Sequence, residues 1–586
     1  MDEHLGDGRR ATGDGRRATG DRGADAAAVE RCVLFAARSQ NALHRLLDTL
    51  PVFAGDRRIR HCFTLVPGSD FSLDALTAIE RAGARTLPWS QALARRFDLV
   101  LAAGPKGDLH ALRGPRVLLP HGAGFNKALP DEGTADSASG LDPAHLLRPD
   151  GALLADLYAF AHPSQVSRLA AVSLEAAARA TVVGDPLLDR FLDSASPDRR
   201  DHFRTALRTG ARRLVVLVST WGPESLLRRR PSLPADLAAV LPYDEYQLAL
   251  VLHPNERVRL GTFDLEQYLE PARRAGLLLP AAYEEWASVV VAADVLVSDH
   301  GSAALYAAAL DRPLLAAYDG GEELLPGSPM AALLDRSPRL GTDVSAAPAA
   351  LAEALRSHRP GSVRAVADTA FAEQGNGLHR LREELYAVLG LEPPTAPAVP
   401  RLLPTPPAAP SPPSAFAVRV HHDAQGRIHV ARHPAHLTPP APAHHLAADA
   451  GTANRRYLQS AAVIHRRADR PGTAQGGATT LTADAWTDRT LTAHPGGRRT
   501  AAVIVSATQC LLRTRTGPLL SAHISPCPER DGPVYADPAA ILSAVHAALV
   551  TAEADGPPST LTCALGERSF AVRLAPATED EAALPV

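Results

Sequence analysis

One segment near the middle of the chain constrains the fold more than any other. Residues 288–315 read SVVVAADVLVSDHGSAALYAAALDRPLL, where an apolar run (289–297) precedes a polar stretch, an alanine-rich stretch and a second apolar run. This order predicts a strand, a tight loop, a helix and another strand. The loop combines a flexible glycine with a hydroxyl at a helix N-terminus, where free N–H groups can bind phosphate. A nucleotide-diphosphate enzyme is therefore the first hypothesis.

Apolar runs alternate with helical stretches on both sides of this segment. Further strands are expected at residues 32–37, 61–66, 97–102, 116–120, 213–219 and 247–253. Helices are expected after the first strand to residue 50, at 73–82 and within 371–391. Such alternation predicts an α/β fold with two Rossmann-like halves, each a parallel sheet with helices on both faces.

The remainder of the chain divides by composition. We expect a disordered tail at 1–28, an N-terminal Rossmann-like half at 29–185 and a C-terminal Rossmann-like half at 186–391. A proline-rich linker at 392–414 is expected to carry no packed core. Residues 415–586 are expected to form a smaller α+β accessory domain of unknown role, with a loop-rich first half and a helix at 538–554.

Charge and cysteine usage exclude several classes of partner. The 61 basic and 64 acidic residues nearly balance, which argues against a nucleic-acid partner. Only Lys106 and Lys127 are lysines, a bias typical of a GC-rich genome. The five cysteines lack metal-site spacing, so no metal is expected, and they fit a reducing cytoplasm. No apolar run approaches the ~20 residues of a membrane span.

Two histidines are expected at strand ends, where open α/β sheets bind their ligands. His121 with Gly122 follows an apolar strand and suits a general base, although a histidine that simply caps the strand is an equal alternative. His253 ends the expected strand at 247–253, just before a proline, and could donate a hydrogen bond to a diphosphate. Arg257 could join it, or be a surface residue.

The loop of the opening segment supplies the other candidates. Ser302 could contact a phosphate oxygen or cap the following helix, next to the flexible Gly301. Asp299 would repel a phosphate, so it is expected to orient the loop through backbone N–H groups or to contact a sugar hydroxyl. The turn Gly184-Asp185-Pro186 joins the two halves and is expected mainly as a turn.

The ordered set of motifs resembles the CDP-glycerol glycerophosphotransferase family of teichoic-acid polymerases and primases, which have the two-domain GT-B architecture. The resemblance covers roughly residues 30–390 and is carried by these elements: His121-Gly122 with Lys127, Gly184-x-Pro186-x-x-Asp189, Ser219-Thr220-Trp221, His253-Pro254, Asp299-x-x-Ser302 with Arg312-Pro313, and Asn376-Gly377-Leu378.

This resemblance implies a transferase that moves a polyol-phosphate or glycosyl group from a nucleotide-diphosphate donor to an acceptor hydroxyl, without a metal or other cofactor. It implies donor binding by Gly122, Lys127, Arg257, Asp299, Gly301 and Ser302, and catalysis by His121 and His253. A membrane-linked acceptor in cell-envelope synthesis, and a cytoplasmic enzyme at the inner face of the membrane, are implied only in this way.

Three departures from the family pattern keep alternatives open. Lys127 follows the His-Gly pair one residue later than usual, Gly222-Pro223 stands where the family has an arginine, and His300-Gly301 replaces an aromatic-serine pair. One alternative is a non-hydrolysing nucleotide-sugar 2-epimerase. The other is a non-catalytic binding protein that keeps the nucleotide fold. The donor base, the acceptor and the oligomeric state are not indicated by the sequence.

Overall fold

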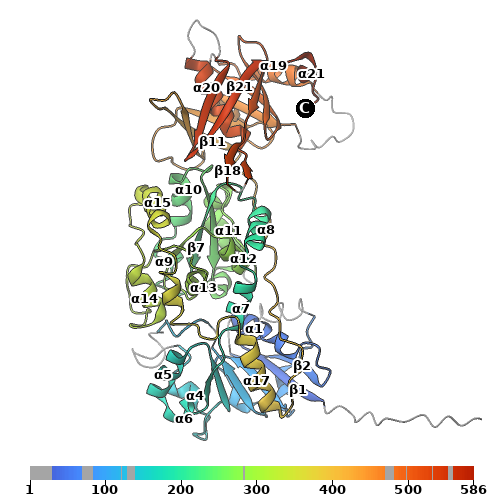
Figure 1. The fold of residues 1–586 in the computed structure, drawn as a ribbon, viewed down its shortest axis with the longest axis vertical. Helices are drawn as coiled ribbons and strands as arrows, with labels where there is room; N and C mark the ends of the chain where they lie inside the picture. The colour runs from blue at the N-terminus through green and yellow to red at the C-terminus, as the bar shows by residue number, and fades with distance from the viewer. Residues whose placement is uncertain are drawn as a thin grey trace, which may run out of the picture.

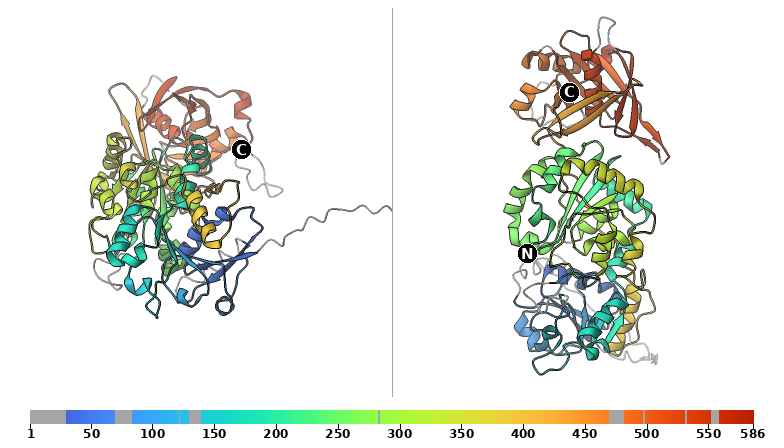
Figure 2. Two further views of the ribbon diagram at one scale, coloured as in Figure 1. Left: turned by 60° about the horizontal axis from the view of Figure 1, so that its bottom comes forward. Right: turned by 90° about the vertical axis from the view of Figure 1, so that its left-hand side faces the viewer.

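The computed structural model describes residues 30–68, 83–120, 122–128, 139–281, 284–468, 481–496, 498–530, 532–551 and 558–586. The predicted tail at 1–28, the predicted helix at 73–82 and His121 lie outside these ranges. Three bodies are stacked along the long axis in the order in which they occur in the chain. Figure 1 colours them blue, green and red, and Figure 2 shows them in two further views.

The first body contains a six-stranded parallel sheet in the order β2-β1-β3-β4-β5-β6. Its strands are β1 (Arg31–Ala37), β2 (Ile59–Leu65), β3 (Leu99–Ala103), β4 (Arg116–Leu119), β5 (Leu157–Phe160) and β6 (Ala180–Val182). Its helices are α1 (Gln40–Leu47), α3 (Trp89–Leu93), α4 (Pro143–Leu146), α5 (Pro163–Val172) and α6 (Leu174–Ala177). The four predicted strands are confirmed to within two residues, whereas the short strands β5 and β6 were not predicted.

The second body contains a four-stranded parallel sheet in the order β10-β9-β7-β8. Its strands are β7 (Arg213–Ser219), β8 (Tyr246–Leu252), β9 (Val295–Ser298) and β10 (Leu314–Ala316). Its helices are α7 (Pro186–Asp193), α8 (Pro197–Ala206), α9 (Leu226–Arg229), α10 (Leu233–Val240), α11 (Pro254–Arg274, broken at Gly261), α12 (Glu285–Ala292), α13 (Ala303–Ala309), α14 (Pro329–Arg336), α15 (Ala347–Ser357) and α16 (Arg364–Ala367).

The apolar run at 289–297 was predicted as one strand, and this prediction is wrong. Its first part belongs to helix α12, and only Val295–Ser298 forms strand β9. Both parts are fully buried, so hydrophobicity alone could not separate a buried helix from a buried strand. The following loop, helix α13 and strand β10 are placed as predicted.

Helix α17 (Gly377–Leu389) returns from the second half to the first. Its apolar side packs into the same core as β1 and η1 (Leu50–Phe53), and Figure 1 shows it beside β1 and β2. Asp189 fixes the start of this helix by accepting hydrogen bonds from the N–H groups of Gly375 (2.9 Å) and Leu378 (3.0 Å). The chain therefore returns to the first half after it has built the second.

The proline-rich segment 392–414 is packed, contrary to the sequence prediction. Leu403 is 2% exposed within the core of the second half, and its N–H donates to the Ser194 hydroxyl at 2.9 Å. The Arg190 side chain donates to the carbonyl of Arg401 at 2.8 Å, and Ser288 donates to that of Pro404. In this segment, called the strap below, side chains of the second half bond to the backbone carbonyl groups of Arg401 and Pro404, which no secondary structure satisfies.

The third body is a closed barrel in the order β11-β12-β20-β21-β17-β16-β15-β14-β13. Its strands are β11 (Ala415–His422), β12 (Ile428–Pro434), β13 (His445–Asp449), β14 (Val463–Arg467), β15 (Thr500–Ser506), β16 (Gln509–Thr514), β17 (Leu520–Ile524), β20 (Thr560–Leu565) and β21 (Arg568–Pro576), with a hairpin of β18 (Cys527–Glu529) and β19 (Gly532–Val534) beside them. Its helices are α18 (Arg455–Ser460), α19 (Ala483–Ala493), α20 (Pro538–Thr551) and α21 (Glu579–Ala582). The predicted loop-rich first half is wrong, because four strands of the barrel lie there.

Helix α20 is apolar on all sides because it contacts barrel strands around the ring, among them β11, β12, β14, β15, β16 and β20. Arg432 joins the barrel to the second half: it is fully buried and donates to Asp244 (2.6 and 2.8 Å) and Asp537 (2.7 Å).

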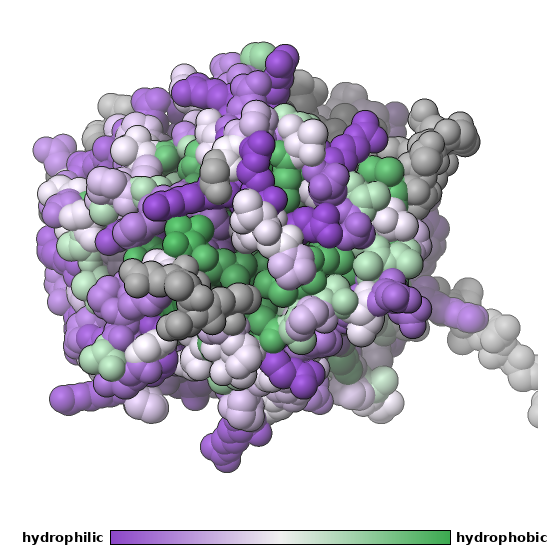
Figure 3. Space-filling model, turned by 90° about the horizontal axis from the view of Figure 1, so that it is seen from above, coloured by the Kyte–Doolittle hydropathy of each residue, from purple (hydrophilic) through white to green (hydrophobic). Residues whose placement is uncertain are grey.

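Seen from above, apolar residues form a band across the face that the barrel presents (Figure 3). No helix in the described ranges is long and apolar enough to cross a membrane.

Candidate functional site

A cavity of about 180 Å³ lies between the first two bodies. The first half lines it with α1 and with the loop after β4, and the second half lines it with the loops that follow β7, β8 and β9. These loops leave the carboxyl ends of parallel strands, the edge where open α/β sheets bind ligands. Leu403 of the strap also lines the cavity.

The loop after β4 meets the loop after β9 across this cavity. A Cβ atom on Gly122 would lie 3.3 Å from the Ser302 hydroxyl, so a glycine permits the close approach of the two halves. Ser302 occupies the N-cap position of α13, yet its side chain makes no capping hydrogen bond there, and it lines the cavity. Of the two roles predicted for Ser302, capping is therefore not seen in the described structure, and contact with a ligand stays a prediction. His121 precedes Gly122 but lies outside the described residues, and its role as a base stays a prediction.

His253 lies at the end of β8 and lines the same cavity. Its Nδ1 accepts a hydrogen bond from the N–H of Asn255 at 3.1 Å and thereby caps α11. A neutral imidazole carries one proton, so Nε2 carries it and is a donor. This geometry suits hydrogen bonding to an anionic oxygen and does not suit a base at Nδ1.

Lys127 crosses from the first half to the second. Its ammonium lies 2.8 Å from Glu323 Oε2, donates to the carbonyl of Trp221 at 2.7 Å and sits 4.5 Å from the centre of the Trp221 ring. Beside it, the N–H of Ala128 donates to the carbonyl of Glu323 at 2.8 Å. This ion pair and these hydrogen bonds therefore join the two halves at one side of the cavity.

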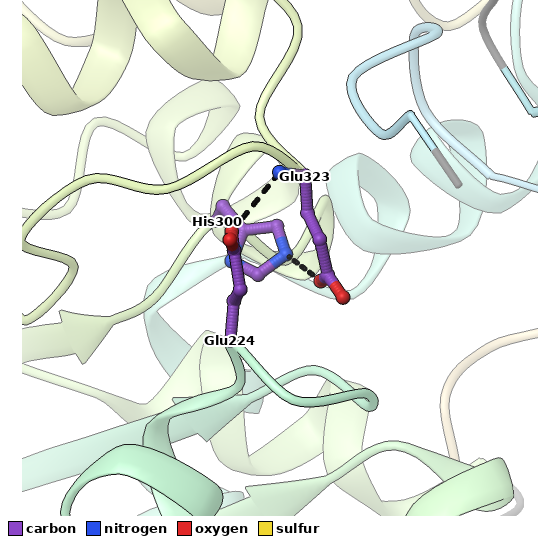
Figure 4. A group of neighbouring side chains, drawn as sticks. All are labelled: Glu224, His300 and Glu323. Atoms are coloured by element: carbon purple, nitrogen blue, oxygen red, sulfur yellow. Dashed lines mark hydrogen bonds and ion pairs between the residues drawn. The ribbon is translucent and has the colours of Figure 1, made fainter. Parts of the chain in front are cut away.

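Glu224, His300 and Glu323 form a cluster next to the pair of Lys127 and Glu323, in which His300 and Glu323 are buried and Glu224 is half-buried (Figure 4). One ligand atom from each lies within 4.8 Å of the others, a spacing that a metal ion could use. His300 Nε2 lies 3.0 Å from Glu323, whose other partner is the ammonium of Lys127. Glu224 accepts from Tyr318 and from the N–H groups of residues 322 and 323. Both carboxylates thus already pair with protein donors, and this arrangement favours a hydrogen-bonded cluster over a metal site.

Asp299 and Arg257 point away from the cavity. Asp299 is fully buried, and its carboxylate accepts from the N–H groups of Thr220 (2.9 Å), Leu226 (2.8 Å) and Gly301 (2.9 Å). It orients the two loops, as the sequence predicted for one of its two possible roles. Arg257 donates to the carbonyl of Pro280, and neither residue is among those that line the cavity in the described ranges.

The turn between the halves bonds to two residues that line the cavity, Arg45 and Tyr306. Asp185 accepts two hydrogen bonds from Arg45 (2.8 and 2.9 Å) and one from the Tyr306 hydroxyl (2.9 Å), and it also caps α7. Burial alone would raise the pKa of Asp185, but the charge and hydrogen bonds of Arg45 outweigh this and lower it. The turn is structural, as expected, because it ties one helix from each half together.

Several lining residues were not predicted, among them His44, Arg45, Trp286 and Tyr306. Burial lowers the pKa of His44 to about 4, so this ring is neutral at pH 7. These side chains lie on helices, and a single sequence does not show which turn of a helix faces the partner half. Glu323 was missed because its segment, Gly320 to Leu324, has no periodic pattern.

No protein-family model matches the sequence, and no curated protein matches it. Solved structures with a similar arrangement include the wall teichoic acid polymerase TagF (14% identity, 61% of this chain, 89% of that chain, TM-score 0.43). Others are Staphylococcus aureus MnaA with UDP (11%, 62% and 99%, 0.40) and Anabaena HepE with UDP and glucose (15%, 62% and 100%, 0.38). TM-scores this low establish neither family nor activity, so the two-sheet architecture rests on the strand order given above.

Proposed function

We propose that the protein is a GT-B-type transferase that moves a polyol-phosphate or glycosyl group from a nucleotide-diphosphate donor to an acceptor hydroxyl. The observation that supports this best is the convergence of donors on one cavity: Nε2 of His253, the Ser302 hydroxyl and the Lys127 ammonium. Lys127 uses two of its three N–H donors on Glu323 and Trp221, which leaves one for a ligand.

The chemistry of the transfer needs donors of this kind. The acceptor oxygen bonds to the transferred phosphorus or anomeric carbon, the bond to the departing nucleotide breaks, and a base takes the proton of the acceptor hydroxyl. Negative charge then grows on the departing phosphate oxygen, which preoriented hydrogen-bond donors stabilise. We keep His121 as the candidate base, and a membrane-linked acceptor as the candidate acceptor.

Calorimetry of the purified protein with CDP-glycerol, CDP-ribitol, UDP-sugars and GDP-sugars tests the donor class. For any donor that binds, His253→Asn and Ser302→Ala should each lower transfer by ~10²-fold, the effect of one lost transition-state donor. Asparagine is a strong N-cap, so His253→Asn retains the start of α11 while removing the donor at Nε2.

Ser196→Ala, which alters the cap of a helix away from the cavity, and His202→Asn serve as matched controls and should retain activity. Epimerised nucleotide sugar formed without an acceptor would instead support the 2-epimerase. No binding by any nucleotide would refute the transferase and leave the non-catalytic binding protein.

A further inference from the structure

Lys127 is unusual in this chain because nearly every other cation is an arginine. The sequence has 61 basic residues, of which only Lys106 and Lys127 are lysines. The space around Lys127 explains why an ammonium fits there. A Cβ atom on Gly222 would lie 3.0 Å from the Lys127 Nζ and 3.0 Å from Glu323 Oε1, and Gly222 has φ +97°. A guanidinium is larger than an ammonium and would crowd the same backbone.

Glu323 contacts two side chains of the cavity wall without lining the cavity itself. It pairs with the ammonium of Lys127 from the first half at 2.8 Å and with Nε2 of His300 from the second half at 3.0 Å. Lys127 and His300 line the cavity, whereas Glu323 is not among its described lining residues. One carboxylate therefore sets the position of two groups from different halves.

The carboxylate is itself firmly held. The glutamate side chain is 3% exposed, and its backbone N–H donates to Glu224 at 3.0 Å (Figure 4). Burial alone would raise the pKa of Glu323, but hydrogen bonds from His300 and Lys127 outweigh burial and lower it, so it is ionised at pH 7. A buried carboxylate with such partners is costly to distort.

We propose that Glu323 is a positioning residue of the cleft, which holds the Lys127 ammonium so that its third N–H meets a phosphoryl oxygen of a bound nucleoside diphosphate. This inference rests on the proposed function for the identity of the ligand. The positioning itself is a property of the free protein and can be tested without turnover.

Two lysines in the whole chain make amine acetylation almost site-specific. The full-length protein is treated with an acetyl N-hydroxysuccinimide ester, and the acetylation rates of Lys127 and Lys106 are followed by peptide mass spectrometry. In Glu323→Gln, acetylation of Lys127 should rise at least about tenfold, because hydrogen bonds between charged groups each contribute roughly that factor or more. Lys106 serves as the internal reference and should not change.

Gly222→Ala is a second variant that disturbs the position of the Lys127 ammonium, because the added Cβ would displace it. If Glu323→Gln fails to fold, the acetylation rate of Lys127 in Gly222→Ala alone tests the proposal. Glu353→Gln, at an exposed glutamate paired with Arg356 on α15, is the matched control and should leave the rate at Lys127 unchanged. Unchanged acetylation of Lys127 in both Glu323→Gln and Gly222→Ala would overturn the positioning role.

Ligand protection then separates the two proposals, with CDP, UDP and GDP as the probes. A diphosphate that binds the wild-type protein should slow acetylation of Lys127 about tenfold and protect the Glu323→Gln variant much less. Equal protection in both proteins would refute positioning while the proposed function stands. If none of the three binds the wild type, the proposed function fails, and with it the diphosphate as the ligand of Lys127.

Discussion

Replacing Asp185 at the join of the two halves should destabilise the protein by a predictable amount. Its carboxylate is fully buried and neutralises Arg45, with the Tyr306 hydroxyl as a third member. Asp185→Asn leaves the guanidinium buried without its counter-charge, which costs about 3–5 kcal/mol. Asparagine still caps α7, whereas Asp185→Ala also removes the cap and should cost about 1 kcal/mol more. Against a total stability of about 5–15 kcal/mol this is a large loss.

Urea unfolding followed by tryptophan fluorescence measures the loss. A Trp486→Phe background removes the barrel tryptophan, so that the signal comes from the first two bodies. Asp193→Asn, at an exposed residue of the same helix, is the control and should unfold like the parent. The reasoning is refuted if Asp185→Asn unfolds within about 1 kcal/mol of the parent, because a buried ion pair cannot be broken so cheaply.

Two further predictions concern the barrel. Arg432→Met leaves the buried Asp244 without its cation, whereas Asp537 keeps Arg467, so Trp486 fluorescence should show barrel unfolding destabilised by about 3–5 kcal/mol; an unchanged transition would contradict this. The second concerns three barrel histidines whose pKa values burial lowers below 6.5, to about 3, 4 and 4: His445, His465 and His546. Between pH 6.5 and about 4 the unfolded chain binds more protons, so stability should fall on acidification by about 1.4 kcal/mol per pH unit for each histidine near pH 5. His546→Gln should reduce this slope in urea titrations from pH 7 to 5, and an unchanged slope would contradict the assignment.

The sequence predicted most of the strands of the two halves because parallel strands are buried on both faces and read as apolar runs. β7 was predicted at its observed bounds, and β8 and β4 within one residue. The same rule misled at 289–297, where a buried helix shares the composition of a buried strand. The barrel was missed because its strands pair across long sequence separations that no local pattern records.

Candidate residues were predicted best where a strand end placed them. Gly122, Lys127, His253, Gly301 and Ser302 line one cavity because each follows a parallel strand at its carboxyl end. Motif position did not reveal which way each side chain turns. Asp299 accepts hydrogen bonds from backbone N–H groups of its own loop and of the loop after β7, and Arg257, in the first turn of α11, donates to the carbonyl of Pro280, so neither side chain is among those that line the cavity in the described ranges.

The departures from the resembled family are physically connected. Gly222 and His300 stand where the resembled family has an arginine and an aromatic residue, and both meet the same carboxylate: the Cβ position of Gly222 lies 3.0 Å from Glu323 Oε1, and His300 Nε2 lies 3.0 Å from Oε2. The ammonium of Lys127 occupies the space that a side chain at position 222 would need. An arginine at 222 would therefore displace Lys127 and break the pairing of Glu323 at once. The two departures therefore belong to one set of contacts around Glu323, and a side chain at position 222 would disturb all of them.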